Sequence, residues 1–247
     1  MTLGEITEHP ERTDLPDDRC SLRSPRLCGA KLVAFGDSVT EGVGHSGVTG
    51  ETSYPEVLRR KLSAVLGEAV EVVNAGVGGD VTSLALARME RDVLCHAPDC
   101  VLVMFGVNDA GYFRPPEGFA DTPRVDIRTY EENLREMVRR IRAAGAEPIL
   151  LTPAPMGARY GYAGLEPYRK YGLNYLVARY AQVVRSVASE MGVPLVDVYT
   201  VFEEHPRMED FLPDGLHPGV EGQAFIAELV EAAFVERWKD KAKGQGE

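Results

Sequence analysis

Short apolar runs and longer stretches with a helical repeat alternate along most of this chain. The apolar runs occupy residues 31–35, 70–73, 101–105, 149–151 and 195–198. Most of them are nearly continuous in apolar side chains, without the regular polar alternation of a half-exposed strand. Continuous runs are typical of parallel strands that are covered on both faces, so we predict that these runs form one parallel sheet.

The stretches between the runs repeat their apolar residues at the spacing of an amphipathic helix. The four apolar faces comprise Tyr54, Val57, Leu58, Leu62, Val65 and Leu66; Tyr130, Leu134, Met137, Val138 and Ile141; Leu173, Leu176, Val177, Tyr180, Val183, Val184, Val187 and Met191; and Phe225, Ile226, Leu229, Val230 and Phe234. Gly67, Gly145 and Gly192 follow the first three faces, where C-terminal caps are expected.

This order of strands and helices is typical of an α/β protein. We predict a three-layer α/β/α sandwich with a parallel sheet of about five strands and right-handed crossovers. No internal repeat or change of composition divides the chain, so we expect a single domain over residues 30–238. Residues 1–29 are polar and are interpreted as a tail or a surface strap, and residues 239–247 as a C-terminal tail.

Four short blocks stand at the ends of predicted strands or before the last helix. They are Gly36-Asp37-Ser38, Asn74-Ala75-Gly76-Val77-Gly78-Gly79-Asp80, Gly106-Val107-Asn108-Asp109 and Asp214-Gly215-Leu216-His217-Pro218. Each block alone is typical of a turn or a helix cap. Because the first three follow consecutive strands of one parallel sheet, we expect them to meet at the same sheet edge, where reactive residues of such folds collect.

The four blocks, in this order, resemble those of the SGNH (GDSL-type) hydrolase family, and the resemblance covers residues 31–235. The first block reads Gly-Asp-Ser-Val in place of Gly-Asp-Ser-Leu, which changes no reacting atom. The resemblance implies a flavodoxin-like SGNH hydrolase fold and a serine esterase. It assigns Ser38 as the nucleophile, His217 as the base that later acts as an acid, and Asp214 as the carboxylate that orients the imidazole.

The same resemblance implies an oxyanion hole built from the backbone N–H groups of Ser38 and Gly79 and the side-chain amide of Asn108. At Gly79 we expect a Cβ to crowd the approaching carbonyl oxygen. Asp37 and Asp109 are interpreted as structural carboxylates that accept backbone N–H groups in turns. No Gly-x-Ser-x-Gly pattern surrounds Ser38, and the glycine block does not match a dinucleotide-binding fingerprint.

No metal and no organic cofactor is expected. The spacing of the four cysteines, Cys20, Cys28, Cys95 and Cys100, matches no common zinc pattern. We expect Cys95 and Cys100 to be small buried side chains. Cys20 and Cys28 could pair in an oxidising compartment, but without a secretory signal free thiols are favoured.

The charge balance restricts the partners. A formal net charge of −11 argues against a nucleic-acid-binding surface and against adhesion to anionic lipid. No apolar run approaches the ~20 residues that a membrane span needs, so none is expected. Residues 1–29 carry several acidic side chains and lack the apolar core of a secretory signal. We therefore expect a cytoplasmic protein whose partner is a small-molecule ester.

Two long connections begin at the predicted reactive edge, over residues 110–128 and 153–171. Both are rich in aromatic residues, and long loops at this edge often shape substrate pockets. We predict that Tyr112, Phe113, Tyr160 and Tyr162 form a pocket wall. The same aromatics could instead pack on one another or on a neighbouring subunit, which leaves a homo-oligomer open. His45, close behind Ser38, is interpreted as a solvated or capping histidine.

The functional prediction is a serine esterase that acts through an acyl-serine intermediate. We prefer a short-acyl ester, such as an acetyl ester, of a sugar or another small alcohol. The alternatives within enzymes are a lysophospholipase or acyl-CoA thioesterase acting on longer chains, and an acyltransferase. The alternatives outside this class are a catalytically inert binding module on the same fold and a flavodoxin-like domain with bound flavin.

Overall fold

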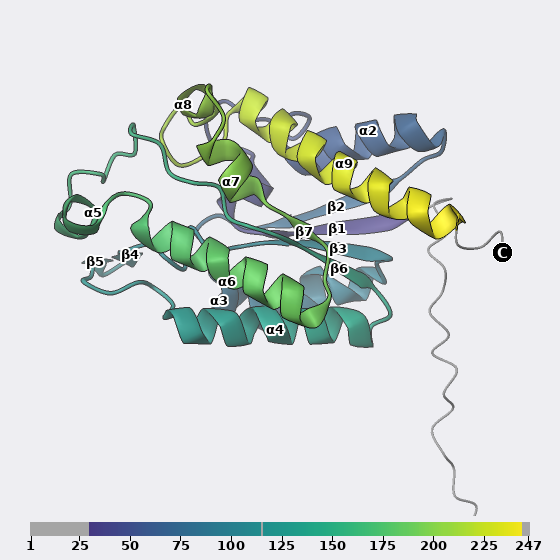
Figure 1. The fold of residues 1–247 in the computed structure, drawn as a ribbon, viewed down its shortest axis with the longest axis horizontal. Coiled ribbons are helices and arrows are strands. Elements are labelled where there is room, and N and C mark those ends of the chain that lie inside the picture. Colours follow the sequence, from purple (N-terminus) through teal and green to yellow (C-terminus); the bar gives the residue numbers. More distant parts are fainter. Residues whose placement is uncertain (1–29, 115, 244–247) are drawn as a thin grey trace, which may run out of the picture.

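A parallel sheet of five strands lies at the centre of the molecule (Figure 1). The computed structural model describes residues 30–114 and 116–243. The strands of the sheet stand in the order β2-β1-β3-β6-β7. Their bounds are β1 (Lys31–Gly36), β2 (Glu71–Gly76), β3 (Cys100–Met104), β6 (Glu147–Leu151) and β7 (Leu195–Val196). All neighbouring pairs are parallel, as predicted.

Alternate residues of the central strands enter two separate hydrophobic cores, one on each face of the sheet. In β1, Val33 and Phe35 belong to one core, and Leu32 and Ala34 belong to the other. Strand β3 is buried at every position. Because both faces need apolar side chains, the strands appear in the sequence as continuous apolar runs.

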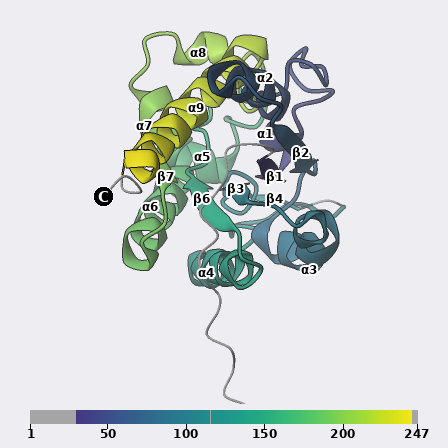
Figure 2. The ribbon, with the colours of Figure 1, turned by 90° about the vertical axis from the view of Figure 1, so that its right-hand side faces the viewer.

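Helices cover both faces of the sheet (Figures 1 and 2). Helices α2 (Tyr54–Leu66), α7 (Val198–Glu203) and α9 (Val220–Lys243) contribute to one core. Helices α3 (Thr82–Asp92), α4 (Ile127–Ala143) and α6 (Tyr175–Met191) contribute to the other. The predicted three-layer α/β/α sandwich is therefore confirmed.

The helix ends follow the expected capping residues. Gly67, Gly145 and Gly192 all have positive φ, as expected for glycines that end helices. Asp126, a cap that the sequence analysis did not name, precedes helix α4, and its side chain accepts the N–H groups of Arg128 and Thr129. The sequence therefore marked these boundaries through the chemistry of the caps as well as through apolar spacing.

One helix and the ends of two elements differ from the sequence pattern. Helix α3 is not singled out by apolar spacing, because its buried side chains are Thr82, Ala85 and Met89, of which only the last is large and apolar. Strand β7 stops at Val196, since the next residue, Asp197, accepts the N–H of Thr200 and begins α7. Helix α9 continues to Lys243, past the expected domain end at residue 238, through residues of good helix propensity.

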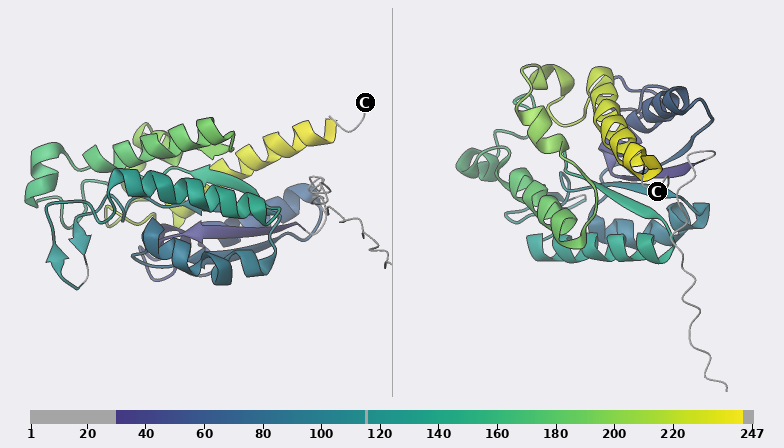
Figure 3. Two further views of the ribbon diagram at one scale, coloured as in Figure 1. Left: turned by 90° about the horizontal axis from the view of Figure 1, so that it is seen from below. Right: turned by 45° about the vertical axis from the view of Figure 1, so that its right-hand side comes forward.

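Several short elements lie in the connections. They are α1 (Ser38–Glu41), η1 (Leu94–His96), β4 (Phe113–Arg114), β5 (Gly118–Phe119), α5 (Glu166–Tyr171) and α8 (Met208–Phe211). Strands β4 and β5 pair as an antiparallel hairpin within the long connection at residues 110–128. The hairpin and α5 project from the same end of the molecule, opposite the end of α9 (Figure 3). Both long aromatic connections therefore emerge together.

The cysteine prediction is wrong for one residue. Cys100 is buried in β3, but Cys95 is exposed in η1, where its thiol donates to the Arg91 carbonyl oxygen at 2.6 Å. Cys20, Cys28 and the expected tail at residues 1–29 lie outside the described residues. Among the residues that the structure describes, no helix is both long enough and apolar enough to cross a membrane.

Candidate active site

Ser38 stands at the first position of α1, directly after β1. The preceding residue, Asp37, caps this helix by accepting the N–H of Val39 at 2.9 Å. Asn74 of β2 holds α1 from the side, because its amide donates to the carbonyl oxygen of Thr40 at 3.0 Å. Ser38 is therefore fixed at the carboxyl end of the sheet by a cap and by a neighbouring strand.

His217 and Asp214 lie in a tight turn between α8 and α9. One oxygen of Asp214 accepts the backbone N–H groups of Leu216 and His217, at 2.8 and 2.7 Å. The other lies 2.8 Å from Nδ1 of the His217 ring. The second ring nitrogen, Nε2, lies 3.1 Å from the Ser38 hydroxyl oxygen. Carboxylate, imidazole and hydroxyl thus form one continuous hydrogen-bonded chain across 179 positions of sequence.

The carboxylate of Asp214 is held in its charged form. Partial burial works to raise its pKa, but the His217 and Leu216 N–H groups and the His217 ring outweigh burial, so the pKa lies below its ordinary value. Asp214 is therefore ionised at neutral pH and can stabilise a positive charge on the imidazole.

The expected oxyanion donors follow three adjacent strands. Ser38 follows β1, Gly79 follows β2 and Asn108 follows β3, and the order β2-β1-β3 places these strand ends side by side. The amide nitrogen of Asn108 is buried and makes no hydrogen bond of ordinary geometry within the described residues. Gly79 is exposed, and its N–H makes none there either. Both donors can therefore serve a ligand.

The structure gives a backbone reason for glycine at position 79, beside the expected one. A Cβ placed there would meet no protein atom within 4 Å. The residue instead has φ of +72°, a conformation that glycine adopts without strain. The Gly79 carbonyl oxygen accepts a hydrogen bond from Arg124 at 2.8 Å, which fixes this loop against the segment that follows Asn108.

Arg88 of α3 joins the ends of two of these strands. Its guanidinium donates to Asp80 at 2.7 Å and to the carbonyl oxygens of Ala75 and Gly36, both at 2.9 Å. Asp80 is buried and also accepts the N–H of Val81. The Arg88 guanidinium therefore links the strand ends that lead to the Ser38 and Gly79 blocks, and its ion pair with the buried Asp80 helps to hold it there.

Asp37 and Asp109 are buried carboxyl groups that accept backbone N–H groups, as the sequence predicts. Asp109 accepts both the N–H and the hydroxyl of Thr82. Burial raises the pKa of Asp37 to about 7, although the N–H of Val39 and the Asn108 amide work in the opposite direction. Burial also raises the pKa of Asp109 to about 6. Within the described residues, neither carboxyl group makes a hydrogen bond to the side chains of Ser38, His217 or Asp214.

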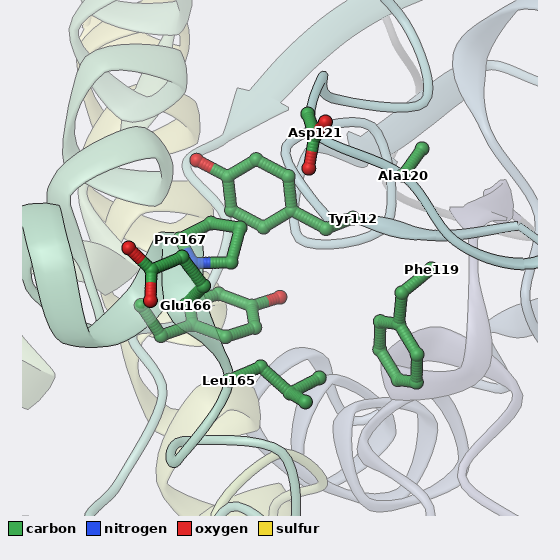
Figure 4. A pocket seen from close by; sticks show the side chains of 8 residues that line it. Tyr112, Phe119, Ala120, Asp121, Leu165, Glu166 and Pro167 are labelled. Carbon is green, nitrogen blue, oxygen red and sulfur yellow. The ribbon is translucent and has the colours of Figure 1, made fainter.

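The four aromatic residues of the expected pocket wall occupy different places. Tyr112 is buried and lines a cavity of about 170 Å³ at the end of the molecule (Figure 4). Phe113 and Tyr162 are partly exposed and pack on each other and on Phe119. Tyr160 contacts both Tyr162 and Tyr168. Of the four, Tyr112 alone lines this cavity, whereas Phe113, Tyr160 and Tyr162 pack on other aromatic rings.

This aromatic cluster is connected to the turn that carries His217. The N–H of Gly157 donates to the Gly215 carbonyl oxygen at 2.9 Å. Gly215 has φ of +78°, and a Cβ there would lie 2.0 Å from the backbone nitrogen of Tyr160. Only glycine permits this approach. The loop that bears Tyr160 and Tyr162 therefore starts beside the hydrogen-bonded chain.

The family model of the GDSL-like Lipase/Acylhydrolase family matches residues 34–225, a range that includes Ser38, Gly79, Asn108, Asp214 and His217. The chain belongs to this family. A GDSL-like hydrolase of known structure, the lipase/acylhydrolase from Enterococcus faecalis, superposes with a TM-score of 0.65 at 29% identity, covering 84% of this chain and 96% of that one. The expected family and fold are both confirmed.

The relatives of this GDSL-like chain carry several names. An uncharacterized lipoprotein of Bacillus subtilis, YqeF, is 33% identical over 70% of this chain and 72% of its own length. An acetylxylan esterase of Geobacillus stearothermophilus is 31% identical, over 81% of this chain and 91% of its own. Thioesterase 1/protease 1/lysophospholipase L1 of Escherichia coli is 29% identical, over 80% and 79%. Membership of this family supports ester hydrolysis as the reaction, whereas the names of these relatives indicate different substrates.

Three residues of this GDSL-like site were missed by sequence reasoning. His45 stacks on His217, Arg88 joins two strand ends, and Arg124 holds Gly79. Arg88 and Arg124 lack a local signal, because their carbonyl partners lie far away in the sequence. His45 follows Ser38 closely, but the ring that it contacts lies 172 positions further on (217 − 45).

Proposed function

We propose that this protein is a carboxylic ester hydrolase in which Ser38 is the nucleophile, His217 the general base and acid, and Asp214 the orienting carboxylate. The observation that carries the proposal is the continuous chain Asp214–His217–Ser38, with contacts of 2.8 and 3.1 Å. A serine hydroxyl reacts slowly until a neighbouring base accepts its proton. The imidazole nitrogen stands where that transfer requires it.

The reaction proceeds in two halves. Ser38 Oγ attacks the ester carbonyl carbon while His217 Nε2 takes its proton, which gives a tetrahedral intermediate. The bond to the leaving alcohol then breaks, His217 returns the proton to that alcohol, and an acyl-serine remains. Water attacks the acyl-serine while His217 takes its proton; the bond to Ser38 Oγ then breaks, His217 returns the proton to that oxygen, and the carboxylic acid is released.

The negative oxygen of each tetrahedral intermediate is stabilised by the N–H groups of Ser38 and Gly79 and by the Asn108 amide. Nδ2 of Asn108 is buried and makes no hydrogen bond of ordinary geometry among the described residues, its one neighbour of this kind being the carboxyl group of Asp37, and this supports the role. Such donors are effective because they are fixed before the reaction and act away from bulk water.

We propose a short-acyl ester of a sugar or another small polar alcohol as the preferred substrate. The cavity between the two aromatic connections supports this choice, because it is lined by the carboxyl-bearing Asp121 and Glu166 as well as by Tyr112 and Phe119. Carboxylates accept hydroxyl groups of a polar alcohol but disfavour a long hydrocarbon chain. The acetylxylan esterase relative points in the same direction.

A lysophospholipase or acyl-CoA thioesterase is the second candidate, favoured by the name of the Escherichia coli relative. A series of p-nitrophenyl esters from acetyl to palmitoyl separates the two, with Ser38→Ala as the matched control. We expect the highest kcat/KM for acetyl or propionyl and no turnover by Ser38→Ala. A maximum at octanoyl or longer would favour the second candidate.

The inert binding module is tested by the same series. A protein that hydrolyses none of these esters, while circular dichroism shows it to be folded, would support binding without catalysis.

The cytoplasmic location also stays a prediction, and one relative carries the name of a lipoprotein. Fractionation of the producing cell, followed by detection of the protein in each fraction, tests the location.

A further inference from the structure

His45 lies flat against the ring of His217. The two ring centroids are 4.1 Å apart, and the ring planes differ by 17°. His45 comes from the loop between α1 and α2, whereas His217 comes from the turn before α9. No other aromatic ring contact to His217 is found among the described residues. The stack therefore joins two distant segments at the proposed base.

The loop that carries His45 is built to hold this position. The N–H of Val48 donates to the His45 carbonyl oxygen at 2.8 Å, and Val48 is buried. The His45 Nε2 atom lies 4.0 Å from Glu41 of α1. A Cβ at Gly78 would also lie 4.0 Å from Nε2, so the ring stands between the proposed base and the glycine block.

The hydrogen-bond contacts of His217 to Asp214 and Ser38 lie at Nδ1 and Nε2, on the edge of the ring. Rotation about the Cβ–Cγ bond would move both nitrogens out of line with these partners. A flat neighbour packed on one face of the ring opposes that rotation. We propose that His45 is a positioning residue for His217, which keeps both nitrogens aligned for proton transfer, and this inference rests on the proposed function.

The charge of His45 suits this role. Burial lowers the pKa of His45, and the neighbouring His217 lowers it further, while Glu41 and Asp214 work in the opposite direction. These are the charged or titratable groups that face the ring from α1 and from the turn. At neutral pH His45 is therefore uncharged, and an uncharged aromatic face is compatible with the imidazolium that forms on His217. A protonated His45 would repel the positive charge that forms on His217.

The test compares three variants of the whole protein on the best short-chain p-nitrophenyl ester. His45→Ala removes the flat face, and His45→Phe keeps it without a titratable group. His205→Ala is the matched control, because His205 packs on Phe211 and Phe225 at a different place. Reactive sites are counted by burst titration, so kcat refers to folded enzyme only.

We expect His45→Ala to lower kcat by about ten- to a hundredfold with little change in KM, as for a misplaced catalytic group. His45→Phe should keep kcat within about threefold of the wild type, and His205→Ala should match the wild type. In the pH profile of kcat/KM, the acidic limb of the wild type should be steeper than that of His45→Phe, because one fewer group titrates.

Two results would overturn the inference alone: an unchanged kcat in His45→Ala, or a loss in His45→Phe as large as in His45→Ala. A wild-type protein that hydrolyses no ester would overturn the proposed function and this inference together. The wild-type measurement therefore separates the two failures.

Discussion

At the scale of the residue, the proposed reactivity of Ser38 depends on groups that come from two other parts of the chain. Its hydroxyl contacts His217, which contacts Asp214, and the Asn108 amide comes from the loop after β3. The carboxylate of Asp214 is fixed before any substrate arrives, because it accepts two backbone N–H groups. Such preorganisation is what lowers the barrier of acyl transfer.

Replacing members of this chain should separate their roles. We expect Ser38→Ala and His217→Ala each to lower kcat by about a millionfold, and Asp214→Asn to lower it by about ten thousandfold, the scale found where such groups act as a unit. Steady-state kinetics on p-nitrophenyl acetate measures the losses, with thermal unfolding as the control for folding. Near-normal turnover in His217→Ala would refute the assignment of the base.

The amide of Asn108 should act mainly in the transition state. We expect Asn108→Ala to lower kcat by about 100- to 1000-fold with little change in KM, the usual cost of one lost oxyanion donor. Asn108→Asp, which replaces the donor by an acceptor, should lose at least as much. A tenfold higher KM with unchanged kcat would instead place Asn108 in ground-state binding.

At the scale of the element, the site depends on the adjacent ends of β1, β2 and β3. The apolar runs and the four blocks were enough to predict this arrangement, because strand burial and strand-end chemistry are both visible in local sequence. Helix α3 was missed, because small and polar residues such as Thr82 and Ala85 make up most of its inner face. Contacts such as Arg88 to Gly36 and His45 to His217 were missed because the folded topology brings those residues together.

The ion pair between Arg88 and Asp80 should stabilise the two strand ends. Arg88→Met leaves the buried Asp80 without its charged partner, so we expect the free energy of unfolding to fall by about 3–5 kcal/mol. The double variant Arg88→Met/Asp80→Asn should recover part of this loss, because it removes the unpaired charge. Urea denaturation measures both, and a double variant no more stable than Arg88→Met would contradict this explanation.

At the scale of the whole molecule, the two layers of helices bury carboxyl groups beside the site. Asp37 and Asp109 have pKa values raised to about 7 and about 6 from an ordinary value of 3.8. At pH values between the ordinary pKa of 3.8 and these raised pKa values, the folded protein binds more protons than the unfolded chain. The stability that these groups contribute is therefore full at acid pH and is lost as the pH rises through the folded pKa values.

We expect the free energy of unfolding to fall as the pH rises from about 4 to about 7, at a rate of up to about 1.4 kcal/mol per pH unit for each group. Asp37→Asn keeps the helix cap and removes one titrating group, so its stability should change less across this window. Urea denaturation at several pH values compares the two proteins. An equal slope in Asp37→Asn would show that Asp37 is not responsible.

The most direct test of the central claim is covalent labelling with a fluorophosphonate, with the modified peptide located by mass spectrometry. An activated serine should react at its hydroxyl, so the wild type is predicted to carry one adduct, on Ser38. Ser38→Ala should carry none, and His217→Ala should react far more slowly. An adduct on another residue, or equal labelling of the wild type and His217→Ala, would contradict the account.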